Sequence, residues 1–146
     1  MFTFKLQSVL NYRQSIEERK QLAFAEGQKA LEKETALLAG IRGEKDLFLT
    51  QLKEMQSSIF NAADVSLYLS YYDLCKEKEA LQIKTVERVS AEVEELRKAL
   101  LEAVQNRKAM DNLNEKQRLA YEEKMAGIER RSGDETAVLR FIRQKK

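Results

Sequence analysis

The residues that carry most enzyme chemistry are scarce in this sequence. Its 146 residues include one cysteine and no histidine, which excludes Ser-His and Cys-His nucleophiles, a zinc site and a histidine-containing iron carboxylate site. The segment between Gly40 and Gly43 lacks the Gly-Lys-Ser/Thr ending of a phosphate-binding loop. Adjacent carboxylates such as Glu94 and Glu95 are typical of a solvated helix face. We therefore predict that the protein is not an enzyme and holds no metal, cofactor or small-molecule ligand.

The composition favours long helices. The chain has no proline and five glycines, and 34% of its residues are charged. Irregular connections normally carry Pro and Gly, so few turns are expected, and a β-sandwich or a doubly wound α/β fold is excluded. The net charge of +2 does not favour nucleic acid as a partner. No stretch has the length and apolarity of a secretory signal or a membrane span, and the lone cysteine indicates a reducing compartment, so a cytoplasmic protein is expected.

Two interruptions divide the helical pattern. Near the first, Asn61 or Asp64 can cap a following helix by accepting hydrogen bonds from its first amides. At the second, Gly133 can end a helix in the left-handed conformation, and Asp134 can cap a new one. The expected elements of this single all-α domain are a helix over about 3–58, a turn over about 59–64, a helix over about 64–131 and a short tail over 132–146.

The heptad pattern predicts an antiparallel two-helix coiled coil. With a turn near residue 62, contacting residues should have numbers that sum to about 124. In this register Glu17 meets Arg107 and Lys45 meets Glu79, so both charged interruptions of the apolar series meet an opposite charge. The apolar pairs at the same sum are Phe24/Leu100, Leu31/Val93, Leu38/Val86, Leu52/Tyr72 and Ile59/Val65, with Leu10/Asn114 as the mismatch. A second seam, at sum 123, includes Gly27/Leu96, Phe48/Cys75 and Met55/Tyr68.

Apolar residues also lie beside the predicted seam near the turn. Leu67, Leu74 and Leu81 form a seven-spaced row, and Tyr71 lies one turn from two of them. The opposing helix carries Leu37, Ile41 and Phe48 on a similar flank. One interpretation is a wide seam in a slightly rotated helix pair; the other is a groove for a partner protein.

The two chain ends are expected to meet at the end far from the turn. The last seven residues carry four basic side chains and no acidic one, with apolar residues between them. Such a tail could be disordered, or could dock on an acidic surface, anionic lipid or nucleic acid. At the other terminus Phe2, Phe4, Leu6, Val9 and Leu10 are more apolar than an isolated helix end requires. Together these ends suggest insertion into another protein.

Motifs at both ends resemble those of one family. The opening pattern is Phe4-x-Leu6-x-x-Val9-Leu10-x-x-Arg13-x-x-x-Glu17-Glu18, and the closing pattern is Asp134-Glu135 followed by Arg140-Phe141. With the length and organisation of the whole chain, they resemble the FliJ family of the bacterial flagellar type III protein export apparatus. Ser132-Gly133 stands where family members tend to continue as helix.

The resemblance implies a function in flagellum assembly. It implies a stalk-like antiparallel coiled coil, similar to the stalk subunit of rotary ATPases, that binds the export ATPase ring and the membrane export gate and escorts substrate chaperones. Such a protein would be cytoplasmic and peripherally associated with the inner-membrane export apparatus. The residues assigned to the ring are Phe4, Leu6, Val9, Leu10, Arg13, Arg140 and Phe141. The residues assigned to the gate are Ile41, Phe48, Tyr71, Leu74 and Leu81.

Two other classes of protein remain open from the sequence. A homo-oligomeric structural coiled coil would use the same heptads between chains. A nucleic-acid or membrane-surface binder would use the basic tail and would lose affinity as the salt concentration rises.

Overall fold

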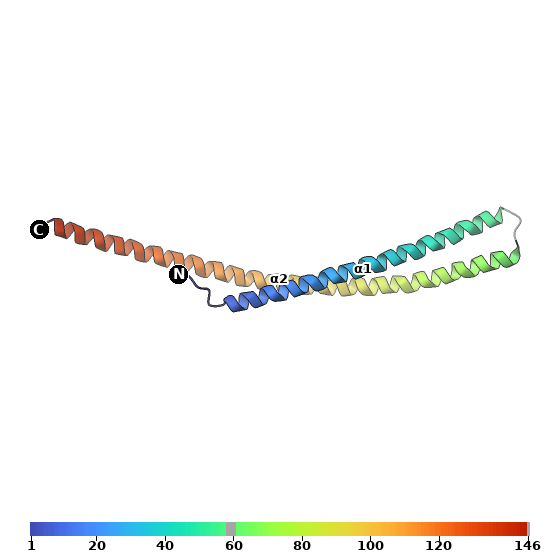
Figure 1. The fold of residues 1–146 in the computed structure, drawn as a ribbon, viewed down its shortest axis with the longest axis horizontal. Coiled ribbons are helices and arrows are strands. Elements are labelled where there is room, and N and C mark those ends of the chain that lie inside the picture. The colour runs from blue at the N-terminus through green and yellow to red at the C-terminus, as the bar shows by residue number, and fades with distance from the viewer. Residues whose placement is uncertain (58–60, 146) are drawn as a thin grey trace. The chain divides into compact units, whose positions relative to one another are not determined.

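The protein consists of two long α-helices. A computed structural model describes residues 1–57 and 61–145, and within these ranges α1 spans Gln7–Gln56 and α2 spans Ala62–Gln144, with no strand (Figure 1). The predicted all-α fold, an antiparallel helical hairpin, is confirmed.

Asn61 starts α2 in the way that the sequence predicts. Its side-chain Oδ1 accepts a hydrogen bond from the Ala63 amide at 3.1 Å, and its carbonyl oxygen accepts one from the Asp64 amide at 3.0 Å. These bonds satisfy amides that have no partner within the helix. Asp64 lies inside the first turn, where its negative charge interacts favourably with the helix dipole. The helix thus begins two residues earlier than expected. Residues 58–60, which include the first part of the predicted turn and Ile59 of the predicted Ile59/Val65 pair, lie outside the described residues.

The predicted helix end at Gly133 is wrong. α2 continues through Ser132 and Gly133 to Gln144, and no glycine has a positive φ. The Thr136 hydroxyl donates to the Ser132 carbonyl at 2.8 Å, a bond within the helix. A single glycine costs a helix only about 1 kcal/mol relative to alanine, which the good helix formers on either side of residues 132–134 can offset. Residues 132–144 are therefore not a separate tail.

Contacts divide the described chain into two compact units. Unit 2 comprises Arg19–Leu101, and unit 1 comprises Met1–Glu18 together with Glu102–Lys146. Each unit contains part of α1 and part of α2.

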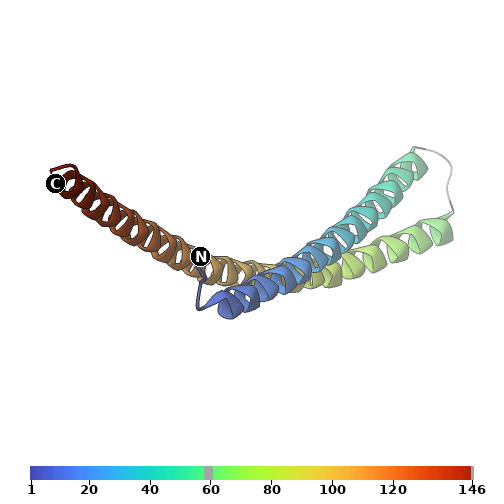
Figure 2. The same ribbon diagram turned by 60° about the vertical axis from the view of Figure 1, so that its left-hand side comes forward.

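In unit 2 the two helices pair antiparallel, and their cross-helix contacts have numbers that sum to between 116, for Gln82 and Glu34, and the predicted 124. Lys45 Nζ donates to Glu79 Oε2 at 2.5 Å, a pair whose numbers sum to 124. Gln82 reaches across to Glu34, donating to its carbonyl oxygen at 2.9 Å and to its carboxylate at 2.6 Å. Both views of the ribbon show α1 and α2 side by side through this unit (Figures 1 and 2).

The core of unit 2 is a narrow seam between the helices. Its buried side chains are Leu38, Leu52, Cys75 and Val89, which all occupy heptad positions at sums 123 or 124. A methyl group added at Gly27 would lie 2.8 Å from Cδ1 of Leu96, so the helices approach closely at this predicted pair. Burial here comes from one stripe per helix, as expected for a two-stranded coiled coil.

Within unit 1 the parts of α1 and α2 also pair with each other. Arg107 forms ion pairs with Glu17, its predicted partner, and with Asp111 one turn further along α2. Phe2 packs its ring on Tyr121 with centroids 5.7 Å apart, and the Met1 ammonium group donates to the Tyr121 hydroxyl at 3.1 Å.

The C-terminal part of α2 extends beyond the N-terminal segment. Met1 lies at Tyr121, whereas α2 continues to Gln144. At 1.5 Å per residue those 23 residues span about 34 Å. The expectation that the two chain ends meet is therefore wrong. We term residues 122–144 of unit 1 the overhang.

Candidate functional site

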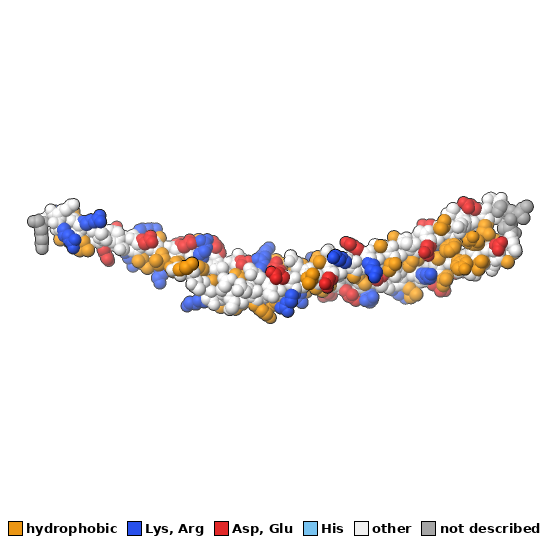
Figure 3. Space-filling view, in the orientation of Figure 1, with side chains coloured by type: hydrophobic (Ala, Val, Ile, Leu, Met, Phe, Trp, Pro, Cys, Tyr) orange, Lys and Arg blue, Asp and Glu red, His pale blue; other side chains and the backbone are white. Residues whose placement is uncertain are grey.

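The most apolar exposed surface of unit 2 lies near its turn end. Figure 3 shows apolar side chains gathering over the parts of α1 and α2 that flank the undescribed residues. We term one side of this surface the turn-end flank and define it by Phe48, Leu67, Tyr71, Leu74 and Leu81. Leu67, Tyr71, Leu74 and Leu81 are all exposed.

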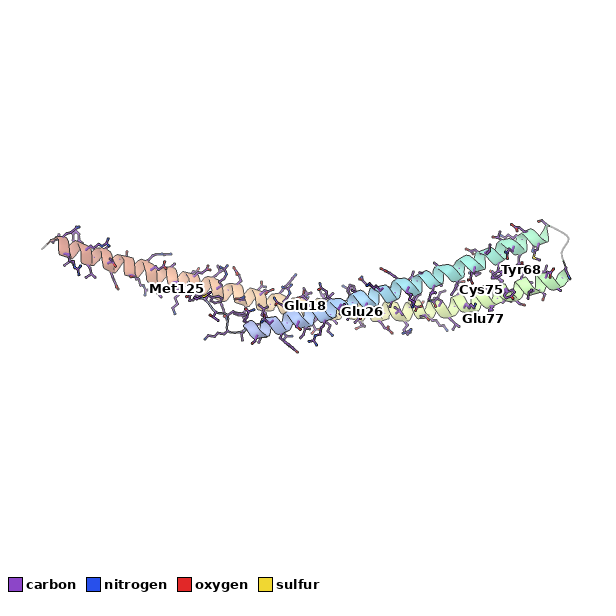
Figure 4. All side chains as sticks on the ribbon, in the orientation of Figure 1. Glu18, Glu26, Tyr68, Cys75, Glu77 and Met125 are labelled. Carbon is purple, nitrogen blue, oxygen red and sulfur yellow. The ribbon has the colours of Figure 1, made fainter. Side chains whose placement is uncertain are left out.

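Aromatic stacking fixes the centre of the turn-end flank. The Phe48 ring lies parallel to that of Tyr71, at an interplanar angle of 5° and a centroid distance of 5.7 Å. It also meets the edge of Tyr68, labelled in Figure 4, at 6.3 Å. Such contacts hold the rings in defined positions. The structure thus brings two residues from the predicted gate set together across the helices, and Leu74 follows Tyr71 by three residues on the same face.

Two members of the predicted gate set belong partly to the seam. Ile41 and Phe48 are half-buried between the helices, while Leu81 is the most exposed member, at 66%. The structure therefore divides this region: the seam takes in Ile41 and Phe48, and the row at Leu67, Leu74 and Leu81 remains exposed.

A second apolar surface near the turn combines predicted seam residues with two leucines, Leu49 and Leu69, that the sequence analysis did not single out. A groove of about 380 Å³ lies on unit 2, lined by Leu49, Leu52, Val65, Leu69 and Tyr72 among others. Leu49 and Leu69 are exposed. These two leucines could have been identified from their positions in the heptad pattern, directly beside the seam on the side opposite the turn-end flank.

The N-terminal motif of unit 1 serves partly as core. Phe4 and Leu10 are buried, with exposed fractions of 6% and 4%, so their side chains already pack within unit 1 and are not available to a partner. Arg13 is half-buried, and Leu6 and Val9 are exposed. The predicted ring-contact set thus has only Leu6, Val9 and part of Arg13 on the surface of this segment.

The overhang holds the rest of the predicted ring-contact set. Arg140 and Phe141 are exposed on α2, and the Lys145 ammonium group lies 4.6 Å from the centre of the Phe141 ring. They follow Tyr121, which contacts Met1, by 19 and 20 residues, or about 30 Å along the helix. The structure therefore does not bring Arg140 and Phe141 together with Leu6 and Val9.

The overhang also exposes apolar residues, the first two of which the sequence analysis did not single out. Met125, labelled in Figure 4, and Ile128 are exposed, as are Val138, Leu139 and Ile142. Met125 and Ile128 could have been found from the sequence because they lie three residues apart, on one face of a helix. Their partners at a sum of 124 would precede Met1, so the predicted seam leaves both residues uncovered. Every described residue from 128 onward is exposed.

Charged groups in the seam hold one another in their ionised forms. The hydrogen bond from Lys45, and then the one from Arg42 at 3.1 Å, lower the pKa of Glu79 below its ordinary value. The same contact with Glu79 raises the pKa of Lys45. The bond to Glu17 raises the pKa of Arg107. These groups pair with each other across the helices, so the arrangement specifies register and offers no base or acid to a substrate.

The described part of the chain contains neither a candidate metal cluster nor a membrane-spanning helix. Within residues 1–57 and 61–145, no group of three or more Cys, Asp or Glu side chains is placed to hold a metal ion. In the same ranges neither helix has a stretch apolar enough, over enough residues, to span a bilayer.

Comparison with protein-family models gives a match over the whole chain. A family model described as "Flagellar FliJ protein" matches residues 1–146. No curated protein and no solved structure matches the chain.

Proposed function

The chain belongs to the FliJ family, whose members are non-catalytic components of flagellar protein export, and we propose on that premise that it is a stalk-like adaptor of the export apparatus. In this proposal one surface binds the export ATPase ring and another binds the cytoplasmic part of the membrane export gate. The protein itself carries no reactive group, and it couples nucleotide hydrolysis to the gate by its stiffness and its two contacts. It also escorts substrate chaperones, at the cytoplasmic side of the inner membrane.

The observation that carries the ring contact is the exposed overhang. A helix whose apolar side chains face water over about 34 Å offers a surface that the protein does not use to pack against itself. Arg140 and Phe141 lie on it, beside other basic and apolar residues. Leu6 and Val9 form a second, smaller exposed patch on unit 1. Phe4 and Leu10 support the ring contact only indirectly, by packing the N-terminal segment.

The observation that supports the gate contact is the turn-end flank. Tyr71 is stacked on Phe48 and exposes one side, and Leu74 and Leu81 extend the apolar row along α2. A preformed aromatic platform loses little side-chain entropy on binding, and aromatic residues are enriched at the centres of protein interfaces. We assign the binding energy to Tyr71, Leu74 and Leu81, with Phe48 and Ile41 as the support beneath them.

Capture by the purified export ATPase tests the ring contact. We expect the double variant Arg140→Glu/Phe141→Asp to lose at least tenfold in affinity, because it removes a cation and an apolar contact together. The matched control is Leu22→Asp, at an exposed residue of α1 outside both proposed surfaces. Undiminished capture of the double variant would contradict the ring contact. Phe4→Asp is not an informative variant, because it would destabilise unit 1.

Capture by the cytoplasmic part of the gate tests the second contact. We expect Leu74→Ala/Leu81→Ala to weaken binding about tenfold and to leave the helix content and the midpoint of unfolding unchanged, since both side chains are exposed. Leu101→Ala is the control, at an exposed leucine of the same helix away from the flank. Wild-type affinity in the double variant would contradict the assignment.

A further inference from the structure

Polar contacts between the helices of unit 2 are gathered in one section. Four hydrogen bonds cross there: Glu79 accepts one each from Arg42 and Lys45, and Gln82 donates two to Glu34. Among the described residues of unit 2, the charged side chains that are half-buried are Glu34, Lys45 and Glu79. We term residues 34–45 of α1 and 79–82 of α2 the polar section.

Two glycines of the polar section have no packing role. A methyl group added at Gly40 or Gly43 would meet no facing atom within 4 Å, whereas one added at Gly27 would lie 2.8 Å from Cδ1 of Leu96. Neither Gly40 nor Gly43 has a positive φ. Glycine lowers the stability of a helix interior and gives the backbone more conformational freedom, and it is one of the residues at which helices bend. Since no close approach and no special conformation requires them, these two residues act on α1 through its flexibility.

The cross-helix hydrogen bonds can hold the helices in register while α1 bends. Glu79 has two donors, so it keeps one partner when the other moves away. Gln82 donates to the carbonyl oxygen of Glu34 at 2.9 Å, and this oxygen also belongs to the hydrogen-bond ladder of α1. Long side chains make these bonds, and they follow a change in helix separation better than close apolar packing does. Within the polar section Leu38 is the one buried residue, and segments with few buried apolar contacts open more readily than the core.

The polar section lies directly beside the turn-end flank. Phe48 of the flank follows the section by three residues on α1, and Leu81 of the flank lies within the section on α2. Buried side chains lie on either side of the section, at Cys75 toward the turn and at Val89 away from it. A bend confined to this section would therefore turn the flank and leave the helix pair stiff on both sides.

From the polar contacts, the two glycines and their position, we propose that the polar section is a joint at which the helical hairpin of unit 2 bends while its register is kept. The bend changes the direction in which the turn-end flank faces. This inference does not depend on the proposed contacts with the ATPase ring or the gate, because it concerns the hairpin alone. It assigns the stiffness of unit 2 to the stretches on either side of the joint.

Native-state hydrogen exchange of the full chain tests whether the joint opens. Protection factors of the α1 amides should be at least tenfold lower at residues 36–45 than at residues 24–33 on one side and 48–52 on the other, because the joint opens without the rest of the helix. Uniform protection along α1, or protection that falls steadily toward the turn, would overturn the proposal.

Replacement of the glycines tests the cause of the opening. The double variant Gly40→Ala/Gly43→Ala should raise the protection factors at residues 36–45 at least tenfold, since both substitutions favour the closed helix. The matched control is Gly127→Ala/Gly133→Ala, which replaces two glycines of unit 1 that also have no facing atom within 4 Å. The control should leave protection at residues 36–45 at the wild-type value. An equal effect of the two double variants, or no effect of either, would contradict the joint.

Spin labels on either side of the joint measure the bending itself. Labels are introduced through Lys29→Cys and Thr50→Cys, at exposed positions of α1, together with Cys75→Ser. The two positions are 21 residues apart, or about 32 Å along a straight helix. The distribution of distances between the labels should narrow when the two glycines of the joint are replaced by alanine, and should stay unchanged in the control variant. A distribution of equal width in all three backgrounds would show that the hairpin does not bend at this section.

Discussion

Two glycines of α1 differ in their surroundings and should respond differently to substitution. A methyl group added at Gly40 would have no heavy atom within 4 Å, whereas one added at Gly27 would lie 2.8 Å from Cδ1 of Leu96 and 3.4 Å from Cγ2 of Val93. Neither glycine has a positive φ. The backbone therefore accepts alanine at both positions, and the facing helix decides the difference.

The expected magnitudes follow from helix propensity and packing. Gly40→Ala should stabilise the protein by about 1 kcal/mol, and raise the melting temperature by about 2–4 °C. Gly27→Ala should gain less, about 0–0.5 kcal/mol, because the end of the flexible Leu96 side chain must move away. Gly27→Leu should destabilise by about 1–2 kcal/mol, since overpacking a close helix contact exceeds the gain in propensity.

Denaturant unfolding followed by circular dichroism measures these differences. The slope with denaturant should stay constant, so that changes in midpoint report stability. In a Leu96→Ala background the space opposite Gly27 is larger, and Gly27→Ala should then recover the full gain seen at Gly40. Equal stabilisation at Gly27 and Gly40 in the wild-type background, or stabilisation by Gly27→Leu, would refute the close approach of the helices at this pair.

Two further predictions concern the dependence of stability on pH and the continuity of α2. Because the pKa of Glu79 is lowered in the folded state, its contribution to stability is present above its ordinary pKa and is lost as the pH falls through the folded-state value. Glu79→Gln should therefore reduce the loss of unfolding free energy as the pH is lowered into the acid range. An unchanged loss in this variant would contradict the contact with Lys45. Gly133→Ala should increase helix content and slow amide exchange around residue 133, whereas a left-handed helix end there would make alanine unfavourable.

The helical register could be predicted from the sequence because charges mark it. Glu17 and Lys45 interrupt the apolar series, and among registers within one heptad of this one only a sum of 124 gives each an opposite charge, the two ion pairs that the structure contains. Apolar residues alone are interchangeable between neighbouring registers, but a charge in the seam is costly without its partner. The start of α2 was predictable for a similar reason, since Asn61 satisfies helix amides through a local hydrogen bond.

The extent of the overhang could not be predicted from the residues at 131–134. Ser132, Gly133 and Asp134 are each common at helix ends, yet each is tolerated inside a helix at a cost of about 1 kcal/mol or less. These residue types therefore do not decide whether the helix ends or continues. The position of the N-terminus was predictable in principle, since a sum of 123 places Phe2 at Tyr121. Phe4 and Leu10 are buried because the N-terminal segment packs against α2 near Tyr121. Without that placement, their apolar side chains in the sequence indicate a surface for a partner.

The most direct test of the account measures whether one chain folds back on itself in the stated register. Spin labels at Lys29→Cys and Glu95→Cys, with Cys75→Ser, occupy exposed positions of α1 and α2 whose numbers sum to 124. In protein diluted with unlabelled chain, we predict a distance between the two labels of about 20–30 Å. Paired helix axes lie about 8–10 Å apart, and the labels extend from exposed positions of the two helices. A separation approaching about 100 Å, as in a continuous helix, or a short distance that disappears on dilution, would contradict it.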